Sequence, residues 1–294
     1  MAPHTAHLEQ ARYLPVVQAV MAQAGLNIAQ DRWDIRTEGS AHIVINMGNL
    51  LSVRVAKTPE VGQKVARRTE VLRRMPHNLP FEVPRPVTRT ISRHGYTACG
   101  VSWIQGEPRR PGPAPVKAIA QLTRSIHGID YDGMEPYLDQ PHEHWGGKDW
   151  AATLREAVIP HLLRSNRKTA EAVLDHVLSL DEVTPTFIHN DLAGHNILWN
   201  GDKLTGVIDW DHATIADPAY DWASLGSWYG WESLRKAITA EEEKRAKVLE
   251  HLLAFQAVAY AVNNCKGGAI VRLALERADR YLMDRKDDIL TPTL

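Results

Sequence analysis

The sequence predicts an α+β protein with a small antiparallel β-sheet lobe followed by a helical lobe. Short apolar segments separated by turn residues fill the first third of the chain, a pattern typical of antiparallel strands. Apolar residues at helical spacing dominate the remainder. With 294 residues, 44% of them hydrophobic, the chain can bury a large core and divide into two domains. We expect these domains at residues 1–103 and 104–294.

The elements of the first lobe follow in order along the chain. An amphipathic helix is expected over 6–24, where Pro15 would kink it or split it. A helix over 61–75 precedes a proline-rich connector at 78–86. The five expected strands are joined in part by turns at 38–41 and 48–49, and they lie at 33–36, 43–47, 50–56, 87–93 and 96–104.

The second lobe is mostly helical, with an irregular acidic insert at 130–150. A hairpin pattern interrupts the helices: Phe187-Ile188 leads into a polar loop, and a turn at 200–202 separates two further short strands. Rigid backbone at the ends of a hairpin can aim polar side chains. The expected helices are 116–129, 151–163, 166–180, 218–229, 231–237, 241–264 and 268–284.

The polar loop and the strand after it carry an ordered set of polar residues. His189 and Asp191 are followed by Asn196, and Asp209 ends the apolar run of the last strand. Phosphoryl transfer needs an Asp that takes the proton of the attacking hydroxyl, an Asn that holds one magnesium ion, and a second Asp that holds the magnesium bridging the nucleotide phosphates. The order predicts catalysis by Asp191 and magnesium binding by Asn196 and Asp209.

This set resembles the signature of the aminoglycoside phosphotransferase and choline kinase-like family, small-molecule relatives of the protein kinases. Asp217, Pro218 and Asp221 extend the resemblance. It implies a bilobal protein kinase-like fold, ATP or GTP and Mg²⁺ as cofactors, and an alcohol group as acceptor. It also implies structural roles for His189, whose ring would brace the loop, and for Asp221, which would brace the loop backbone from the following helix.

The first lobe offers the residues of a nucleotide site. Period-2 alternation puts Arg54 on the strand face opposite its apolar neighbours, so it is the expected phosphate-binding cation, with Lys57 as the alternative. The resemblance implies that Glu70 pairs with this cation. It also places a phosphate loop at Gly39 and Ser40, and a hinge whose backbone groups would bind the base at Ser102, Trp103 and Ile104.

Composition favours a cytoplasmic enzyme. The chain has two cysteines, and its sequence holds neither an apolar run of membrane-spanning length nor a signal-peptide core. Residues 1–101 carry a formal charge of +6 and the remainder −7, which suits a polyphosphate in the first part and magnesium with a cationic acceptor in the second. The expected partners are a nucleoside triphosphate and a small hydroxylated substrate, with no nucleic acid and no membrane, for a monomer or weak dimer.

Within the family, the segments from Gly194 to Trp199 and from Val207 to Asp211 are most similar to antibiotic phosphotransferases of the viomycin and capreomycin type. A cationic antibiotic, either such a peptide or an aminoglycoside, is therefore the expected acceptor, and resistance the expected result. The candidate contacts are carboxylates and an aromatic wall: Asp211, Asp130, Asp132, Glu135, Asp139, Glu232, Trp228 and Trp231.

Other functions stay open at this point. They are a metabolic kinase for choline, a sugar or an amino alcohol, a macrolide phosphotransferase, and a metal-dependent hydrolase built on the histidines of the loop region, such as His195 and His212. Asn196 counts against the macrolide branch, which tends to carry His there. The hydrolase lacks the spacing of a strong metal motif. The sequence decides neither the acceptor nor the choice between ATP and GTP.

Overall fold

The computed structural model describes residues 3–37, 39–264 and 267–291 and divides the chain into two compact units. Unit 1 comprises Met1–Arg109, Tyr131–Leu138 and His195–Asp211, and unit 2 comprises Arg110–Asp130, Asp139–Gly194 and His212–Leu294. The chain therefore does not divide once near residue 103 but enters unit 1 three times. Among the described residues, no helix is both long and apolar enough to cross a membrane.

Unit 1 contains a five-stranded antiparallel sheet in the order β1-β2-β3-β5-β4, which confirms the expected antiparallel sheet. The strand expected over 87–93 is shorter and begins at Ile91, and the one expected over 96–104 ends at Ser102. The hairpin between β2 and β3 turns at Gly48 and Asn49, with φ of 58° and 61°. Two positive φ angles match the right-handed strand twist, so the turn residues set the register. The strands are β1 (Trp33–Arg36), β2 (His42–Met47), β3 (Leu51–Ala56), β4 (Ile91–Arg93) and β5 (Tyr96–Ser102).

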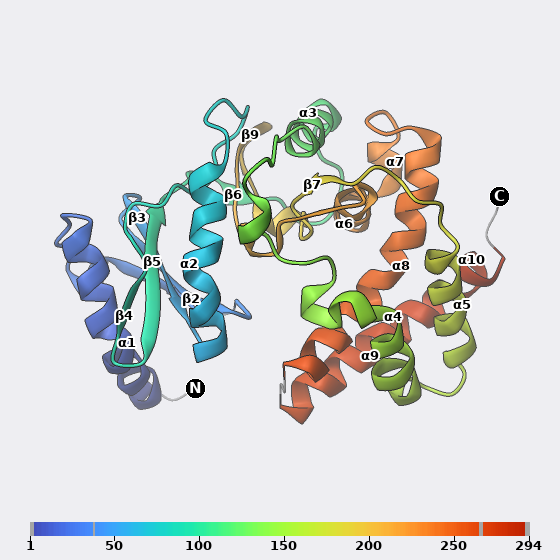
Figure 1. Cartoon of the computed structure of the whole chain (residues 1–294), viewed down its shortest axis with the longest axis horizontal. Helices are drawn as coiled ribbons and strands as arrows, with labels where there is room; N and C mark the ends of the chain where they lie inside the picture. The colour runs from blue at the N-terminus through green and yellow to red at the C-terminus, as the bar shows by residue number, and fades with distance from the viewer. Residues whose placement is uncertain (1–2, 38, 265–266, 292–294) are drawn as a thin grey trace. The chain divides into compact units, whose positions relative to one another are not determined.

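Helices α1 (Pro3–Gln23) and α2 (Pro59–Arg74) lie on opposite sides of this sheet (Figure 1). Pro15 lies inside α1 and does not end it. The apolar face of α1 packs in one core with Val53 and Val55 of β3. Because side chains alternate along a strand, Arg54 projects from the α2 side of the sheet.

A second, three-stranded sheet completes unit 1, in the order β6 (Glu107–Pro108), β8 (Ile197–Asn200), β9 (Lys203–Val207). A Cβ added to Gly206 would lie 2.5 Å from Cγ2 of Ile104 and 3.0 Å from the carbonyl oxygen of Glu82. The N–H of Val207 donates to that same carbonyl at 2.9 Å. The hairpin β8–β9 thus packs on Glu82, which precedes β4, and on Ile104, which follows β5, and these contacts are why it belongs to unit 1.

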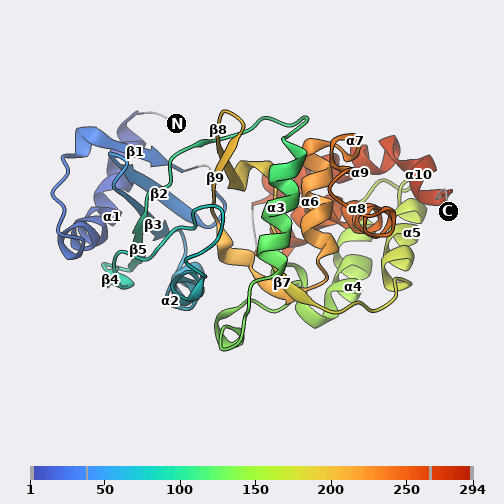
Figure 2. The same ribbon diagram turned by 90° about the horizontal axis from the view of Figure 1, so that it is seen from above.

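Unit 2 is mainly helical, and α8 packs against α6 and α9 (Figure 2). Its strands β7 (Thr186–Ile188) and β10 (Thr214–Ala216) pair antiparallel, and β10 was not expected from the sequence. The helix expected over 151–163 is instead a short α4, a π-helical turn at Leu154–Val158 and a 3₁₀ turn at Ile159–His161, where Pro160 supplies no N–H. The helices are α3 (Val116–His127), α4 (Trp150–Thr153), α5 (Arg167–Leu178), α6 (Ala219–Tyr229), α7 (Trp231–Leu234), α8 (Ala240–Asn263), α9 (Gly268–Asp284) and α10 (Lys286–Leu290).

Candidate active site

The loop after β7 is held by a buried carboxylate on α6. Oδ2 of Asp221 accepts the backbone N–H of His189 at 3.1 Å, and Oδ1 accepts that of Asn190 at 2.8 Å. Nε2 of His127 lies 3.2 Å from Oδ2. Asn190 has φ of 63°, a left-handed conformation that Asn tolerates better than most residues. Asp221 is fully buried, so these charge-assisted bonds form out of contact with water and fix the loop backbone.

Asp191 follows in this loop and is half-buried. Its backbone N–H donates to Nδ1 of the fully buried His189 at 3.3 Å. A Cβ added to Gly194 would lie 2.2 Å from the indole of Trp228, so that ring covers the loop backbone. The aromatic side chain expected to contact the acceptor therefore also packs against the catalytic-loop segment. The backbone around Asp191 is thus restrained by Asp221, His189 and Trp228.

Asn196 and Asp209 lie in unit 1 at the two ends of the β8–β9 hairpin. The carbonyl oxygen of Asn196 accepts the N–H of Ile208 at 2.9 Å, which closes the hairpin just before Asp209. Asn196 is buried, whereas the side chain of Asp209 is 47% exposed, with φ of 59°. An amide oxygen and a carboxylate are ligands that Mg²⁺ accepts, so this end of the hairpin fits the expected metal.

Arg54 joins β3 to the segment that carries Asp209. Its guanidinium binds Asp211 in a bidentate pair, at 2.9 Å to Oδ1 and 2.8 Å to Oδ2, and it reaches Oδ1 of Asp209 at 3.1 Å. Arg68 of α2 adds a contact of 3.2 Å to Oδ2 of Asp211. Burial by itself would raise the pKa of Asp211, but the positive charges of Arg54 and Arg68 hold it well below its usual range.

Asp211 therefore differs from what the sequence predicted. It was expected to contact the acceptor, but it is buried and both of its oxygens accept hydrogen bonds from Arg54. Its position is that of an internal counter-ion. Arg68 was not expected from the sequence, although it falls on the apolar stripe of α2 between Val65 and Leu72, which was a signal of burial.

His42 is a further member of this cluster that sequence reasoning missed. Its Nδ1 lies 3.2 Å from the guanidinium of Arg54. Arginine only donates hydrogen bonds, so Nδ1 accepts one here and carries no proton. Burial, together with the positive charge of Arg54, lowers the pKa of His42 to about 4. The histidine is therefore neutral at physiological pH and orients the strand cation.

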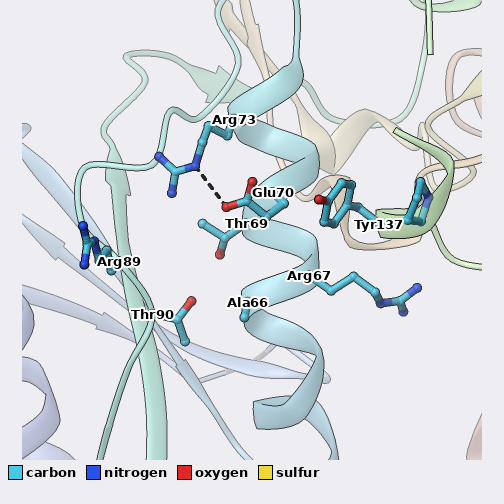
Figure 3. A pocket seen from close by; sticks show the side chains of 9 residues that line it. Ala66, Arg67, Thr69, Glu70, Arg73, Arg89, Thr90 and Tyr137 are labelled. Atoms are coloured by element: carbon cyan, nitrogen blue, oxygen red, sulfur yellow. Dashed lines mark hydrogen bonds and ion pairs between the residues drawn. The ribbon is translucent and has the colours of Figure 1, made fainter. Parts of the chain in front are cut away.

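The expected ion pair between Glu70 and Arg54 or Lys57 was wrong. Glu70 pairs with Arg73 at 3.1 Å and with Arg74, both on its own helix, and it lines a pocket of about 690 Å³ (Figure 3). Glu70 lies two residues after Arg68, and two residues along an α-helix rotate the side-chain direction by about 200°. Glu70 therefore points away from the face that carries the buried Arg68. The wall of this pocket also holds Arg67, Arg89, Thr90 and Tyr137.

Lys57, the alternative cation, binds backbone instead. Its amino group donates to the carbonyl oxygens of Thr37 and Gly39. Gly39 and Ser40 are both exposed. Lys57 thus stabilises the turn that was expected to hold the nucleotide phosphates, and Arg54 is the cation beside the expected magnesium ligand.

The expected hinge supplies fewer backbone groups than predicted. The N–H of Ser102 donates to the carbonyl oxygen of Arg85 at 2.8 Å, so it is already used within unit 1. The side chain of Ile104 packs against Gly206. The indole N–H of Trp103 is buried and has no hydrogen-bond acceptor among the described residues. The N–H of Ser102 is therefore not available to a base.

The candidate acceptor contacts divide into exposed and buried groups. Asp139 was expected in a carboxylate-lined cleft, but it is buried and bonded to His144 at 2.6 Å. Trp231 donates its indole N–H to Glu250 at 2.7 Å and packs against Gly226, so it is held within the helical packing of unit 2. The remaining carboxylates are exposed: Asp130 and Glu232 in unit 2, and Asp132 and Glu135 in unit 1.

An α+β fold, a loop at Asp191 braced by a buried carboxylate, and a hairpin ending in Asp209 fit a phosphoryl-transfer enzyme of the kinase-like class. The profile of the phosphotransferase enzyme family matches residues 39–253. This match covers most of the chain, and the chain belongs to that family. The enzyme class predicted from the sequence is confirmed.

Individual relatives support the same assignment. The chain is 28% identical to the viomycin phosphotransferase of Streptomyces vinaceus over 220 residues, which are 68% of this chain and 75% of that protein. It is 28% identical over 221 residues to the homoserine kinase of Rhodopseudomonas palustris (strain BisB5), covering 70% of this chain and 63% of that one. The solved GDP complex of aminoglycoside 2′-phosphotransferase-IIIa superimposes with a TM-score of 0.76 at 17% identity, covering 92% of this chain and 99% of that one. The kinase-like fold is thereby confirmed.

Proposed function

We propose that this phosphotransferase moves the γ-phosphoryl group of ATP or GTP to a hydroxyl of a cationic antibiotic, a viomycin- or capreomycin-type peptide or an aminoglycoside, and so gives resistance in the cytoplasm. The observation that carries the proposal is the catalytic loop, in which Asp221 fixes the backbone before Asp191. The similarity to viomycin phosphotransferase supports the choice of acceptor.

Asp191 is the catalytic base in this proposal. It accepts the proton of the acceptor hydroxyl as the oxygen–phosphorus bond forms and the bond to the nucleotide's β–γ bridging oxygen breaks. A positioned base contributes about 10²–10⁴-fold to such a step. Asp191→Asn should therefore lower kcat by that factor while nucleotide affinity is retained, because Asp221 and His189 hold the loop backbone.

Asn196 and Asp209 would hold magnesium, which would neutralise charge on the β- and γ-phosphates. Asp209 already meets Arg54 at 3.1 Å. Arg54 in this arrangement binds phosphate oxygens beside the metal ligands and keeps Asp209 oriented. Asp209→Asn should abolish magnesium-dependent nucleotide binding more severely than Asn196→Ala, since it removes the charged ligand, and Asn tolerates the positive φ of this position.

The charge of the acceptor is inferred from the exposed carboxylates of the insert, Asp130, Asp132 and Glu135. Exposed charges act over about a Debye length, roughly 10 Å at 0.1 M salt. Acceptor binding should weaken as salt rises. Glu135→Lys should raise KM more than it lowers kcat, because it removes binding common to ground and transition states.

An amino alcohol is the second candidate acceptor. The homoserine kinase relative covers a similar length of this chain at the same identity as the viomycin enzyme. Both acceptors need the same base and magnesium ligands, so only the acceptor-binding residues would differ. The residues of the loop do not distinguish a metabolic role from a resistance role. The acceptor that is phosphorylated with the higher kcat/KM does.

The deciding experiment is a steady-state screen with ATP and GTP against viomycin, an aminoglycoside, a macrolide, homoserine and choline. The expected result is turnover of a cationic antibiotic with the highest kcat/KM, magnesium dependence, and loss of activity in Asp191→Asn. Preferred turnover of homoserine would replace the acceptor and leave the chemistry unchanged. Near-normal turnover by Asp191→Asn would remove the proposed base.

A further inference from the structure

A cluster of two histidines and one aspartate lies within unit 2, apart from the residues assigned to phosphoryl transfer. One ligand atom each of Asp139, His144 and His212 lies within 4.8 Å of the other two. The Asp139–His144 contact is 2.6 Å, from Oδ2 to Nε2. The rings of His144 and His212 meet edge to face, with centroids 4.1 Å apart. We propose that Asp139, His144 and His212 form a transition-metal site, with Zn²⁺ as the ion it fits best.

The distances leave little adjustment for metal binding. Three atoms no more than 4.8 Å apart share a centre within about 2.8 Å, and Zn²⁺ needs 2.0–2.2 Å to nitrogen and oxygen ligands, so shifts below about 1 Å are sufficient. The ion takes the place of the proton between Asp139 and His144. By exchange with water, that proton moves from Nε2 to Nδ1 of His144, so the imidazole stays neutral and Nε2 binds the metal. A water molecule supplies the fourth ligand of a tetrahedral site.

The backbone around the cluster is fixed before any ion binds. The N–H of Asp139 donates to the carbonyl oxygen of Ala213 at 3.3 Å, and the carbonyl oxygen of Asp139 accepts the hydroxyl of Thr214 at 2.7 Å. These partners directly follow His212, and Thr214 begins β10. The side chain of Asp139 is only 2% exposed. A buried carboxylate beside two imidazoles is a preorganised ligand set rather than a solvated patch of acids.

The donor set also separates this site from the magnesium site. Imidazole nitrogen favours Zn²⁺ and its first-row neighbours, whereas Mg²⁺ prefers oxygen ligands in an octahedron. The magnesium candidates Asn196 and Asp209 lie in unit 1, and all three ligands here lie in unit 2. A bound ion would cross-link the insert at Asp139–His144 to the segment that begins at His212, three residues after Asp209.

The test uses the full chain without a histidine tag, stripped with a chelator. Calorimetry should show one Zn²⁺ per chain that excess Mg²⁺ does not displace, and Co²⁺ should give the visible absorption of a tetrahedral ion. His144→Gln and His212→Gln should each weaken binding by at least about 100-fold, since an inner ligand matters more than the outer partners whose loss costs 10–100-fold. The matched control is His161→Gln, an exposed histidine outside the cluster, which should leave the affinity unchanged.

Unchanged Zn²⁺ affinity in both cluster variants, or an octahedral Co²⁺ spectrum, would overturn the proposal. Circular dichroism of the metal-free variants checks their folding. Should a variant fail to fold, X-ray absorption on the zinc-loaded wild-type protein decides the matter. Two imidazole nitrogens in the inner shell support the site, and fewer than two refute it. None of these measurements depends on phosphoryl transfer, so the two proposals fail separately.

Discussion

Removing the carboxylate of Asp221 should lower both stability and turnover. In Asp221→Ala, the backbone N–H groups of His189 and Asn190 lose acceptors at 3.1 and 2.8 Å in a fully buried site. Each buried donor left unsatisfied costs about 1–3 kcal/mol, which gives roughly 2–6 kcal/mol for the pair. That is a large part of a total stability of about 5–15 kcal/mol.

The loss should appear as a fall in Tm of roughly 5–20 °C, measured by calorimetry, at about 2–4 °C per kcal/mol for a protein of this size. The folded fraction should also turn over slowly, since a displacement of about 1 Å at Asp191 is enough to lower the rate roughly 100-fold. Asp221→Asn keeps one acceptor oxygen, so its Tm and kcat should lie between those of the wild type and those of Asp221→Ala. Asp181→Asn, at an exposed carboxylate of the same unit, is the matched control.

A wild-type Tm in Asp221→Ala would show that the two hydrogen bonds are not the restraint inferred here. A lowered Tm with normal kcat below the transition would separate stability from catalysis. In that case the loop would hold Asp191 by other means, and the bracing role would be limited to folding.

Four further predictions concern Arg54, Asp211, His142 and Gly194. Arg54→Met should cost about 3 kcal/mol in urea unfolding, the low end for breaking a buried ion pair because Arg68 remains, and Arg54→Lys should recover part of it. The pKa of Asp211 is lower in the folded protein than in the unfolded chain, where it is near 4, so its carboxylate stabilises the fold above that pH. As the pH falls, this stabilisation should be lost at a higher pH in Arg54→Met than in the wild type. Burial lowers the pKa of His142 from 6.5 to about 4, so the folded state resists protonation; Tm should fall as pH drops from 6.5 to 4, and less steeply in His142→Gln. Gly194→Ala should lower kcat by driving the loop against the indole of Trp228, and an unchanged kcat would show that the ring yields instead.

The fold was readable from the sequence where local signals were strong. Alternation along β2 and β3, with Gly48-Asn49 between them, predicted a hairpin and placed Arg54 on the face away from the α1 core. β10 was missed because three residues, Thr214–Ala216, carry too short a pattern to register as a strand. The π-helical turn at Leu154–Val158 has helical spacing, and periodicity alone does not separate it from an α-helix.

The sequence identified the residues of the candidate site better than it identified which of them contact one another. The spacing from His189 to Asp209 identified the polar residues because phosphoryl transfer dictates their order. The pairing of Arg54 depended on side chains that reach it from 155 and 157 residues away, and these are Asp209 and Asp211 instead of Glu70. Ion pairs between distant elements follow from side-chain direction after packing, which sequence spacing does not contain.

The hairpin β8–β9 also affects how the protein is made. Unit 1 needs residues up to Asp211, although most of it ends at Arg109. At about 5–20 residues per second, a ribosome needs roughly 5–20 s to synthesise the intervening segment. During that time unit 1 lacks β8, which pairs with β6, and β9, whose Gly206 packs against Ile104. The lobe that emerges first therefore cannot finish folding first, and it presents an incomplete apolar edge to chaperones until two-thirds of the chain has been translated.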